Sequence, residues 1–399
     1  MKIFRRLLKE SIIFAFQALF ANRLRSFLSL LGITIGIFSI ISVFTLVDTM
    51  ENGIRKEIDK LGSDVIYVSK WSWVFTPDYP WWRFVNRPNP DLEDLAALEE
   101  HSEYWDGIAF VGGRGVSVSY KGNEMTRANA NGVSRDYDKV TNLDFEEGRY
   151  FSYSELNLGK NVTIIGGKIA QVLFPNGNAL GKNIKMAGKR VTVIGVLKYQ
   201  GEGSFGVSIN NDRDVIIPVN YARRYYAVRR LGGNIVINPR DDIDAKEIQD
   251  HIRGVMRAHR KIKPLEEEDF SLNTVSAIQG QISGIFTVMH TVGLVIGMFS
   301  ILVGGFSIAN TMFVSVKERT AIIGIQKSLG AKNYFILFQF IFESVLLCLV
   351  GGLAGLILIG LLTLLSTYAF DFEIILSWSN ISMGLGISAV IGLVSGVSP

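Results

Sequence analysis

Residues 27–47 read FLSLLGITIGIFSIISVFTLV and carry no charged side chain. A helix needs about 20 mostly apolar residues to cross the roughly 30 Å hydrocarbon core of a bilayer. The stretch begins behind a long basic segment and lacks a clear small-residue cleavage site, so we interpret it as an anchor and not as a signal peptide. Three further segments, residues 285–313, 335–365 and 381–399, are also long and apolar. The sequence therefore predicts four transmembrane helices, the first of them at residues 27–48.

The remaining long segment, residues 49–284, is polar and separates the first predicted span from the second. Over all 399 residues the mean hydropathy is +0.27, and 48% of the residues are hydrophobic. This hydropathy is too high for an ordinary soluble protein and too low for a chain that lies wholly in lipid. We therefore expect an α-helical membrane domain together with one polar domain large enough to bury a core of its own.

Composition argues against several classes of site. The net charge of +4 does not indicate a nucleic-acid partner. A single cysteine cannot form an internal disulfide, and one cysteine with four histidines argues against a zinc or iron–sulfur site. Cys348 lies in an apolar run and is expected to be a small buried hydrophobe. No catalytic Ser/His/Asp set or paired carboxylate motif stands out.

Lysine and arginine residues in the short segments that flank the spans predict the orientation of the chain. They outnumber acidic residues before the first span and between the second and third spans, whereas the loop at 366–380 carries two acids and no base. We therefore expect the N-terminal segment 1–26, which reads as an amphipathic helix, and the segment 314–334 to be cytoplasmic. Residues 49–284 and 366–380 are expected on the outside.

The polar domain contains alternating strand and helix patterns that predict an α+β fold. Residues 49–60 and 277–284 read as helical stalks that join this domain to the first and second spans. Asp91 is a candidate N-cap of a short acidic helix, and the turn at 121–124 predicts a β-hairpin. NIVINP, a helix over about 242–259 and DFSLNTV predict a βαβ-like unit.

Residues 71–90 read WSWVFTPDYPWWRFVNRPNP and are unusually rich in tryptophan and proline. Proline at this density suits neither a regular helix nor a central strand. Aromatic side chains dominate interfaces, so Trp71, Trp73, Trp81 and Trp82 are candidate interface residues. The alternative, which we prefer, is an irregular loop whose rings pack on their own domain, because tryptophan is usually well buried.

Residues 304–360 carry the most specific pattern in the chain. A glycine-rich helix end is followed by a charged loop and then by an acid in the next span. The loop reads VKERT at 316–320, IGI at 323–325 and KSLGA at 327–331, and the next span contains QF at 339–340 and the acid Glu343. This pattern resembles the FtsX-like permease domain of the MacB, Lol and FtsX transporters. The N-terminal ANRLRSFLSLLGITIGI resembles the first span of these proteins, and EEGRYF, LFPNGNALGK and VTVIGVLKYQG resemble a MacB-like periplasmic core. The resemblance to a MacB-like ABC transporter permease covers nearly the whole chain.

Two features depart from the family pattern. The family usually has an acid at the position of Ile322 and often an arginine at the position of Gln326, so this loop is expected to meet its partner with altered charge pairing. Family members also continue past the position of Pro399 into a short basic cytoplasmic tail, which is either cut off or missing here.

The segment 314–334 allows two interpretations. It reads as a short amphipathic helix with Gly330 well placed as its C-terminal stop. From periodicity alone it is equally well a plain interfacial helix that lies on lipid headgroups. The family resemblance favours a coupling helix that docks into an ATPase, with polar contacts from Glu318 and Arg319 and an apolar face seated in a groove. The candidate residues of this site are Val316, Lys317, Glu318, Arg319, Thr320, Ile323, Gly324, Lys327, Leu329 and Gly330.

Two polar residues lie inside predicted spans, where ionisable side chains are costly. Glu343 is expected to face protein or water; a proton relay is one interpretation, and a structural partner near the cytoplasmic end is the preferred one. His290 is expected to be a satisfied polar residue and not a ligand. Small residues of the second span permit close helix approach within the chain or between two copies, namely Gly293, Gly297, Gly304 and Gly305.

The sequence contains no G-x-x-x-x-G-K-[ST] loop, so it cannot bind nucleotide phosphates by that device. The resemblance therefore implies a permease that is no enzyme by itself and binds no cofactor, with ATP and Mg held by a separate ABC ATPase subunit. It also implies a homodimer in the bacterial inner (cytoplasmic) membrane, with a cytoplasmic N-terminus and a periplasmic domain. A periplasmic adaptor and an outer-membrane exit duct are further candidate partners.

The resemblance implies efflux of a substrate from the periplasmic side by mechanotransmission, in which ATPase closure moves the coupling helix, the spans and the stalks. One alternative is a Lol-type permease that extracts lipoproteins. Another is a regulator or sensor of the FtsX kind that does not transport. The sequence leaves open the substrate and the choice between a homodimer and a heterodimer of permeases.

Overall fold

The computed structural model describes residues 23–62, 65–75, 78–201, 203, 209–225, 232–240, 242–370 and 374–397. The chain forms two compact units. The helical unit consists of Met1–Asn52 and Gly284–Pro399, and the sheet unit consists of Gly53–Ser283. Most of the amphipathic helix predicted over residues 1–26 lies outside the described residues.

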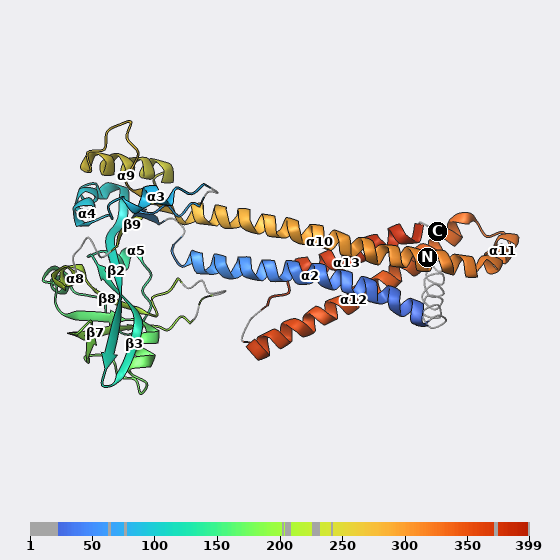
Figure 1. Ribbon diagram of the computed structural model, residues 1–399, viewed down its shortest axis with the longest axis horizontal. Helices are drawn as coiled ribbons and strands as arrows, with labels where there is room; N and C mark the ends of the chain where they lie inside the picture. Colours follow the sequence, from blue (N-terminus) through green and yellow to red (C-terminus); the bar gives the residue numbers. More distant parts are fainter. Residues whose placement is uncertain are drawn as a thin grey trace. The chain divides into compact units, whose positions relative to one another are not determined.

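Long apolar helices build the helical unit (Figure 1). They are α2 (Arg23–Asp59), α10 (Val275–Glu318), α12 (Asn333–Phe370) and α13 (Trp378–Val397), with the short α11 (Thr320–Ser328) between α10 and α12. Among the described residues, four helices are long and apolar enough to cross a membrane by length and composition. Each predicted span falls on one of them, so the prediction of four apolar helices is confirmed, while the ends of the spans stay predictions.

Small residues bring these helices close together. A Cβ on Gly297 of α10 would come within 2.5 Å of Ile40 in α2, so no larger residue fits there without a shift. Ser344 of α12 donates a 2.6 Å hydrogen bond to the carbonyl of Gly392 in α13. Cys348 is fully buried in the apolar core of this unit, as predicted. The other glycines singled out in the second predicted span also face helices of the same chain, namely Gly293, Gly304 and Gly305.

The sheet unit contains a ten-stranded sheet with the order β10-β1-β9-β2-β3-β8-β5-β7-β4, in which β6 pairs with β2 and β7. The strands are β1 (Ile66–Ser69), β2 (Trp105–Tyr120), β3 (Asn123–Val133), β4 (Phe145–Gly148), β5 (Val162–Ile165), β6 (Asn183–Met186), β7 (Lys189–Leu197), β8 (Asp214–Pro218), β9 (Gly233–Pro239) and β10 (Ser271–Thr274). The helices are α3 (Trp81–Val85), α4 (Leu92–Glu99), α5 (Tyr137–Val140), α6 (Tyr153–Asn157), α7 (Gly167–Leu173), α8 (Val219–Tyr225) and α9 (Ala245–His259). This content confirms the predicted α+β domain.

One half of the sheet closes on itself. β2 pairs with both β3 and β6, and the path through β8, β5 and β7 leads from β3 back to β6. An apolar cluster fills this half, and α7 contributes the fully buried Ile169 and Leu173 to it. The predicted hairpin joins β2 to β3 through Lys121 and Gly122, which have φ of 43° and 97° as a type I′ turn requires.

The other half of the sheet contains the predicted βαβ unit. β9 and β10 both pair antiparallel with β1, so they run parallel to each other and are connected through α9. Ile248 and Ile252 of α9 are fully buried in a cluster with Leu98 of α4. Asp91 caps α4 as predicted, because its side chain accepts the backbone N–H groups of Glu93 and Asp94.

Candidate functional site

The segment predicted as one coupling helix, residues 314–334, is divided in the structure. Val316, Lys317 and Glu318 belong to the last turns of α10, and Arg319 separates α10 from α11. The predicted extent of the helix was therefore wrong, because α10 continues past its apolar part. A single helix from 314 to 334 is replaced by the nine residues of α11, followed by a turn into α12.

Gly330 ends α11 in the way the sequence predicted. Its φ of +91° lies in the left-handed region, which a glycine adopts without steric cost. The N–H of Gly330 bonds the carbonyl of Lys327, and the N–H of Ala331 bonds the carbonyl of Gln326, each at 3.0 Å. This pair of hydrogen bonds is the Schellman motif, which satisfies carbonyls at a helix end.

An apolar face of α11 is not covered by the described residues of this chain. Ile325 is 60% exposed and Leu329 is 83% exposed, and Ile322 is exposed on the same face. The predicted apolar face included Leu329 and Ile323. Ile323 is only partly exposed, and the exposed face contains Ile322 and Ile325 instead. The spacing of three and four residues among Ile322, Ile325 and Leu329 is the signal that could have found them.

Arg319 turns toward its own chain. Its Nη1 lies 3.3 Å from Oε2 of Glu343 in α12, and the Glu343 side chain is only 6% exposed. Glu343 thus has a structural partner near the end of the span, which was the preferred interpretation. The guanidinium of Arg319 is directed to Glu343, and its contact with an ATPase stays a prediction.

His290 is held by acidic and aromatic neighbours on α2. Its Nε2 lies 3.3 Å from Oδ1 of Asp48 and 3.7 Å from Oε2 of Glu51, and its ring stacks on Phe44. Asn380 of α13 donates a 2.7 Å hydrogen bond to the other oxygen of Asp48. These contacts tie three helices together, and they agree with a satisfied polar residue.

The tryptophan-rich stretch divides into packed and exposed residues. Trp73 packs on Tyr67 with ring centroids 4.8 Å apart, and the ring of Trp71, which is 41% exposed, has its centroid 5.9 Å from that of Phe84. Trp81 and Trp82 begin the one-turn helix α3 and are both more than half exposed. The preferred interpretation, a loop whose rings pack on their own domain, is therefore wrong for these two residues. The sequence did not predict this turn of helix, because the flanking prolines obscure the helical pattern.

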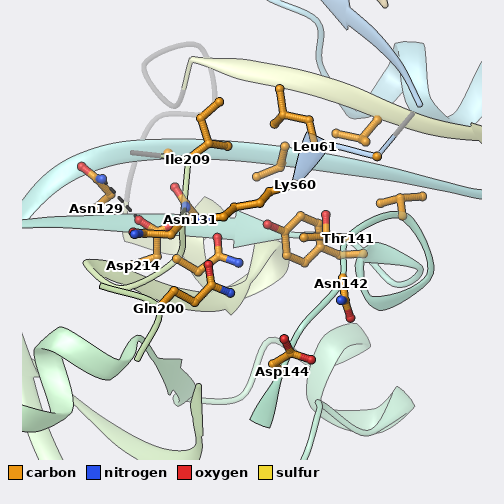
Figure 2. Close-up of a pocket in the computed structure, with 18 of the residues that line it drawn as sticks. Lys60, Leu61, Asn129, Asn131, Thr141, Asn142, Asp144, Gln200, Ile209 and Asp214 are labelled. Atoms are coloured by element: carbon orange, nitrogen blue, oxygen red, sulfur yellow. Dashed lines mark hydrogen bonds between the residues drawn. The ribbon is translucent and has the colours of Figure 1, made fainter. Parts of the chain in front are cut away.

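The sheet unit also contains a polar cavity of about 1130 Å³ (Figure 2). The most buried carboxylate of this cavity is that of Asp214, the first residue of β8. The Oδ2 atom of Asp214 accepts a 2.8 Å hydrogen bond from the side-chain amide of Asn131, and the Oδ1 atom accepts one of 3.3 Å from that of Asn129. Burial raises the pKa of Asp214 to about 6, the two amide donors oppose this shift, and nearby Asp212 adds to it.

This cavity was not predicted from the sequence. Asn129 and Asn131 stand two residues apart in β3, so they share one face of that strand, and β3 pairs in parallel with β8. The spacing of the two asparagines was visible in the sequence, but their meeting with Asp214 depends on a strand pairing between distant segments.

The chain matches known proteins along nearly its whole length. Residues 26–255 match the family described as MacB-like periplasmic core domain, and residues 294–399 match the family described as FtsX-like permease C-terminal. The "Macrolide export ATP-binding/permease protein MacB" of Neisseria gonorrhoeae is 28% identical over 98% of this chain, which spans 58% of that relative's length. The "Uncharacterized ABC transporter permease YknZ" of Bacillus subtilis is 30% identical over 98% of this chain and 96% of its own length.

Among solved structures, the periplasmic region of MacB from Actinobacillus actinomycetemcomitans covers 57% of this chain and 96% of its own, with 16% identity and a TM-score of 0.46. The resemblance stated from residues 304–360 is confirmed by the sequence matches. A MacB-like core domain, an FtsX-like permease domain and four apolar helices occur together here, and the chain belongs to the family of MacB-like ABC transporter permeases.

Proposed function

We propose that this chain is the membrane subunit of an ABC transporter and that it couples ATP hydrolysis by a separate ATPase subunit to efflux of a substrate from the periplasmic side. The ATPase binds ATP and Mg, and this chain binds neither. The permease works as a homodimer in the inner membrane, with its N-terminus and α11 in the cytoplasm and its sheet unit in the periplasm. A periplasmic adaptor and an outer-membrane exit duct complete the proposed path.

The observation that carries the proposal is the apolar face of α11. Ile322, Ile325 and Leu329 are exposed beside basic residues, although the helix itself is closed by a well-formed C-terminal motif. A well-formed helix with an uncovered apolar face is suited to bind in a groove of a partner protein. The ion pair between Arg319 and Glu343 ties the start of this helix to α12, so a push on α11 would reach a membrane helix directly.

The helices also support mechanotransmission as the means of coupling. The chain passes between the two units at Asn52–Gly53 and at Ser283–Gly284, and both places lie inside continuous helices, α2 and α10. Backbone hydrogen bonds fix the torsion angles inside a helix, so a movement at one end of the helix is transmitted along its axis to the other end. The resulting mechanism moves the sheet unit without a wide pore between the spans.

The test is a purification in mild detergent followed by mass spectrometry for a copurifying P-loop ATPase. Wild type is compared with Ile325→Asp, which places a charge on the exposed apolar face, and with Ser328→Asp, which adds the same charge at an exposed polar position of α11. We expect an ATPase to copurify with wild type and Ser328→Asp and to be lost with Ile325→Asp. Absence of any ATPase from the wild-type preparation would contradict the proposal and favour a sensor or regulator.

A further inference from the structure

The polar cavity of the sheet unit has no part in the coupling proposed above. We propose that it binds a ligand through a protonated amine, with the carboxylate of Asp214 as the anchor and Asn129 and Asn131 holding that carboxylate in place. This site is complete within one chain and does not depend on an ATPase partner.

Asp214 keeps hydrogen-bonding capacity that its neighbours do not use. A carboxylate offers about four lone-pair positions, and the two amides occupy one on each oxygen. The residue is 8% exposed, yet it lines the cavity (Figure 2). A donor group of a ligand can therefore reach an oxygen that is already oriented.

The charge of Asp214 lacks a basic partner among the described residues. The groups that act on it are two neutral amides and a second buried carboxylate, that of Asp212. Asp212 is held differently, because it accepts the backbone N–H groups of Gln200 and Gly201 at 3.0 Å each. Neither carboxylate forms an ion pair with a basic side chain among the described residues, so a bound cation can supply the partner that Asp214 lacks.

The walls of the cavity fit an organic amine. Tyr67 and Tyr137 line it, and aromatic faces attract cations. Burial raises the pKa of Tyr137 to about 12, so its hydroxyl stays neutral. No group of three or more His, Cys, Asp or Glu that could hold a metal ion occurs among the residues that the structure describes. An ammonium group is therefore a better match than a metal ion.

The rest of the lining indicates that the amine is one end of a larger polar ligand. A volume of about 1130 Å³ is at the upper end of the roughly 300–1,000 Å³ typical of small-molecule sites. Amide side chains such as Asn142 and Gln200 offer both donors and acceptors around it. The other charged residues that line the cavity are of both signs, namely Asp59, Asp144, Lys60, Arg114 and Lys198.

The proposal is tested on the full chain in phosphatidylcholine nanodiscs, without ATP or any ATPase. Cadaverine serves as the amine probe, and the diol of the same chain length serves as its uncharged counterpart. Binding is followed by saturation-transfer-difference NMR. We expect cadaverine to bind at least about tenfold more tightly than the diol. Asp214→Asn should weaken cadaverine binding about tenfold, whereas Glu124→Gln, a matched change at an exposed acid of β3 that does not line the cavity, should alter it less than about twofold.

The unmodified protein supplies a second readout that requires no variant to fold. Cadaverine stays protonated below neutral pH, but Asp214 titrates near pH 6, so affinity should fall about tenfold between pH 7 and pH 5. Equal binding of amine and diol, or amine binding that ignores both pH and Asp214→Asn, would overturn the proposal. Failure of both probes to bind at about 10 mM would do the same. Because no ATPase is present, these outcomes are independent of the pull-down result.

Discussion

At the scale of single residues, Asp214 places a carboxylate where the fold disfavours its charge. Its pKa rises from 3.8 to about 6, so the folded chain holds this proton more tightly than the unfolded chain does. Protonated Asp214 therefore contributes to the free energy of unfolding below about pH 4, and this contribution is lost as the pH rises through about 6. This rise in the pKa corresponds to about 3 kcal/mol. Asp214→Asn should raise the free energy of unfolding by up to that amount near pH 7.5 and change it little near pH 4, as measured by thermal unfolding of the purified chain.

Asp212 provides the matched control for this experiment. Its carboxylate accepts two backbone N–H groups and is equally buried, so an amide in its place loses acceptor capacity. Asp212→Asn should therefore destabilise the chain near pH 7.5 by about 1–3 kcal/mol. If both variants shifted the unfolding temperature in the same direction near pH 7.5, the assignment of a disfavoured charge to Asp214 would be wrong.

The ion pair of Arg319 and Glu343 makes a prediction about pairs of changes. Removal of one partner leaves a buried charge uncompensated, which lowers the free energy of unfolding by about 3–5 kcal/mol. Replacement of both partners by apolar residues often leaves the free energy of unfolding nearly unchanged. Arg319→Met should therefore lower the unfolding temperature strongly, and Arg319→Met with Glu343→Leu should restore most of it. The measurement is the unfolding temperature in detergent for wild type, both single variants and the double variant. A double variant as unstable as the sum of the singles would show that the pair does not interact.

At the scale of elements, the sequence predicted the features that depend only on residues close together in the chain. The Asp91 cap, the Gly330 stop and the turn at Lys121–Gly122 each depend on backbone groups within a few residues, and all three have the expected geometry. The four apolar helices were equally accessible, since their length and hydropathy exceed what a soluble helix requires.

The parts that could not be predicted depend on contacts between distant segments. The closure of β2 on β6 joins Val118 to Met186, and no pattern in either strand specifies that pairing. The same holds for the meeting of Asn131 with Asp214 and for the pair Arg319–Glu343, whose members lie on different helices. The exposed face of α11 is a different kind of miss, because its spacing was present in the sequence and the wrong face was chosen.

The last turn of α2 is linked to the segment that leads into β8. Glu57 is 6% exposed, accepts the N–H of Ile209 at 3.2 Å and pairs with Lys60 at 2.8 Å. Glu57→Ala leaves the Ile209 N–H without this acceptor, so amide hydrogen exchange over residues 209–213 should accelerate about tenfold, which corresponds to about 1.4 kcal/mol.

Asp59→Ala is the control for that measurement. Asp59 lies two residues further along α2 and accepts a hydrogen bond from Gln279 of α10, at 2.9 Å. Its removal should leave exchange over residues 209–213 unchanged. An equal acceleration in both variants would indicate general fraying of the end of α2 and not a specific link through Glu57.

At the scale of the whole molecule, each unit has its own apolar core, and the chain passes between them only inside α2 and α10. Mechanotransmission therefore requires that these two helices stay unbroken at Asn52–Gly53 and Ser283–Gly284. We predict that a Gly-Gly-Ser insertion after both Asn52 and Ser283 leaves each unit folded and the ATPase bound, because neither core nor α11 is touched. Substrate efflux by cells should nevertheless fall at least about tenfold, since flexible glycine-rich segments do not convey displacement.

The same triplet inserted after Leu265, a fully exposed residue of the sheet unit, tests whether an insertion by itself is harmful. Efflux should stay within about twofold of wild type in that variant, because the insertion lies in a surface loop that tolerates added length. The comparison separates two ways in which the permease could work. If the spans themselves formed the path of the substrate, flexible joints above them would leave transport nearly intact. Loss of efflux with retained ATPase binding is expected only when force must pass along both helices into the sheet unit.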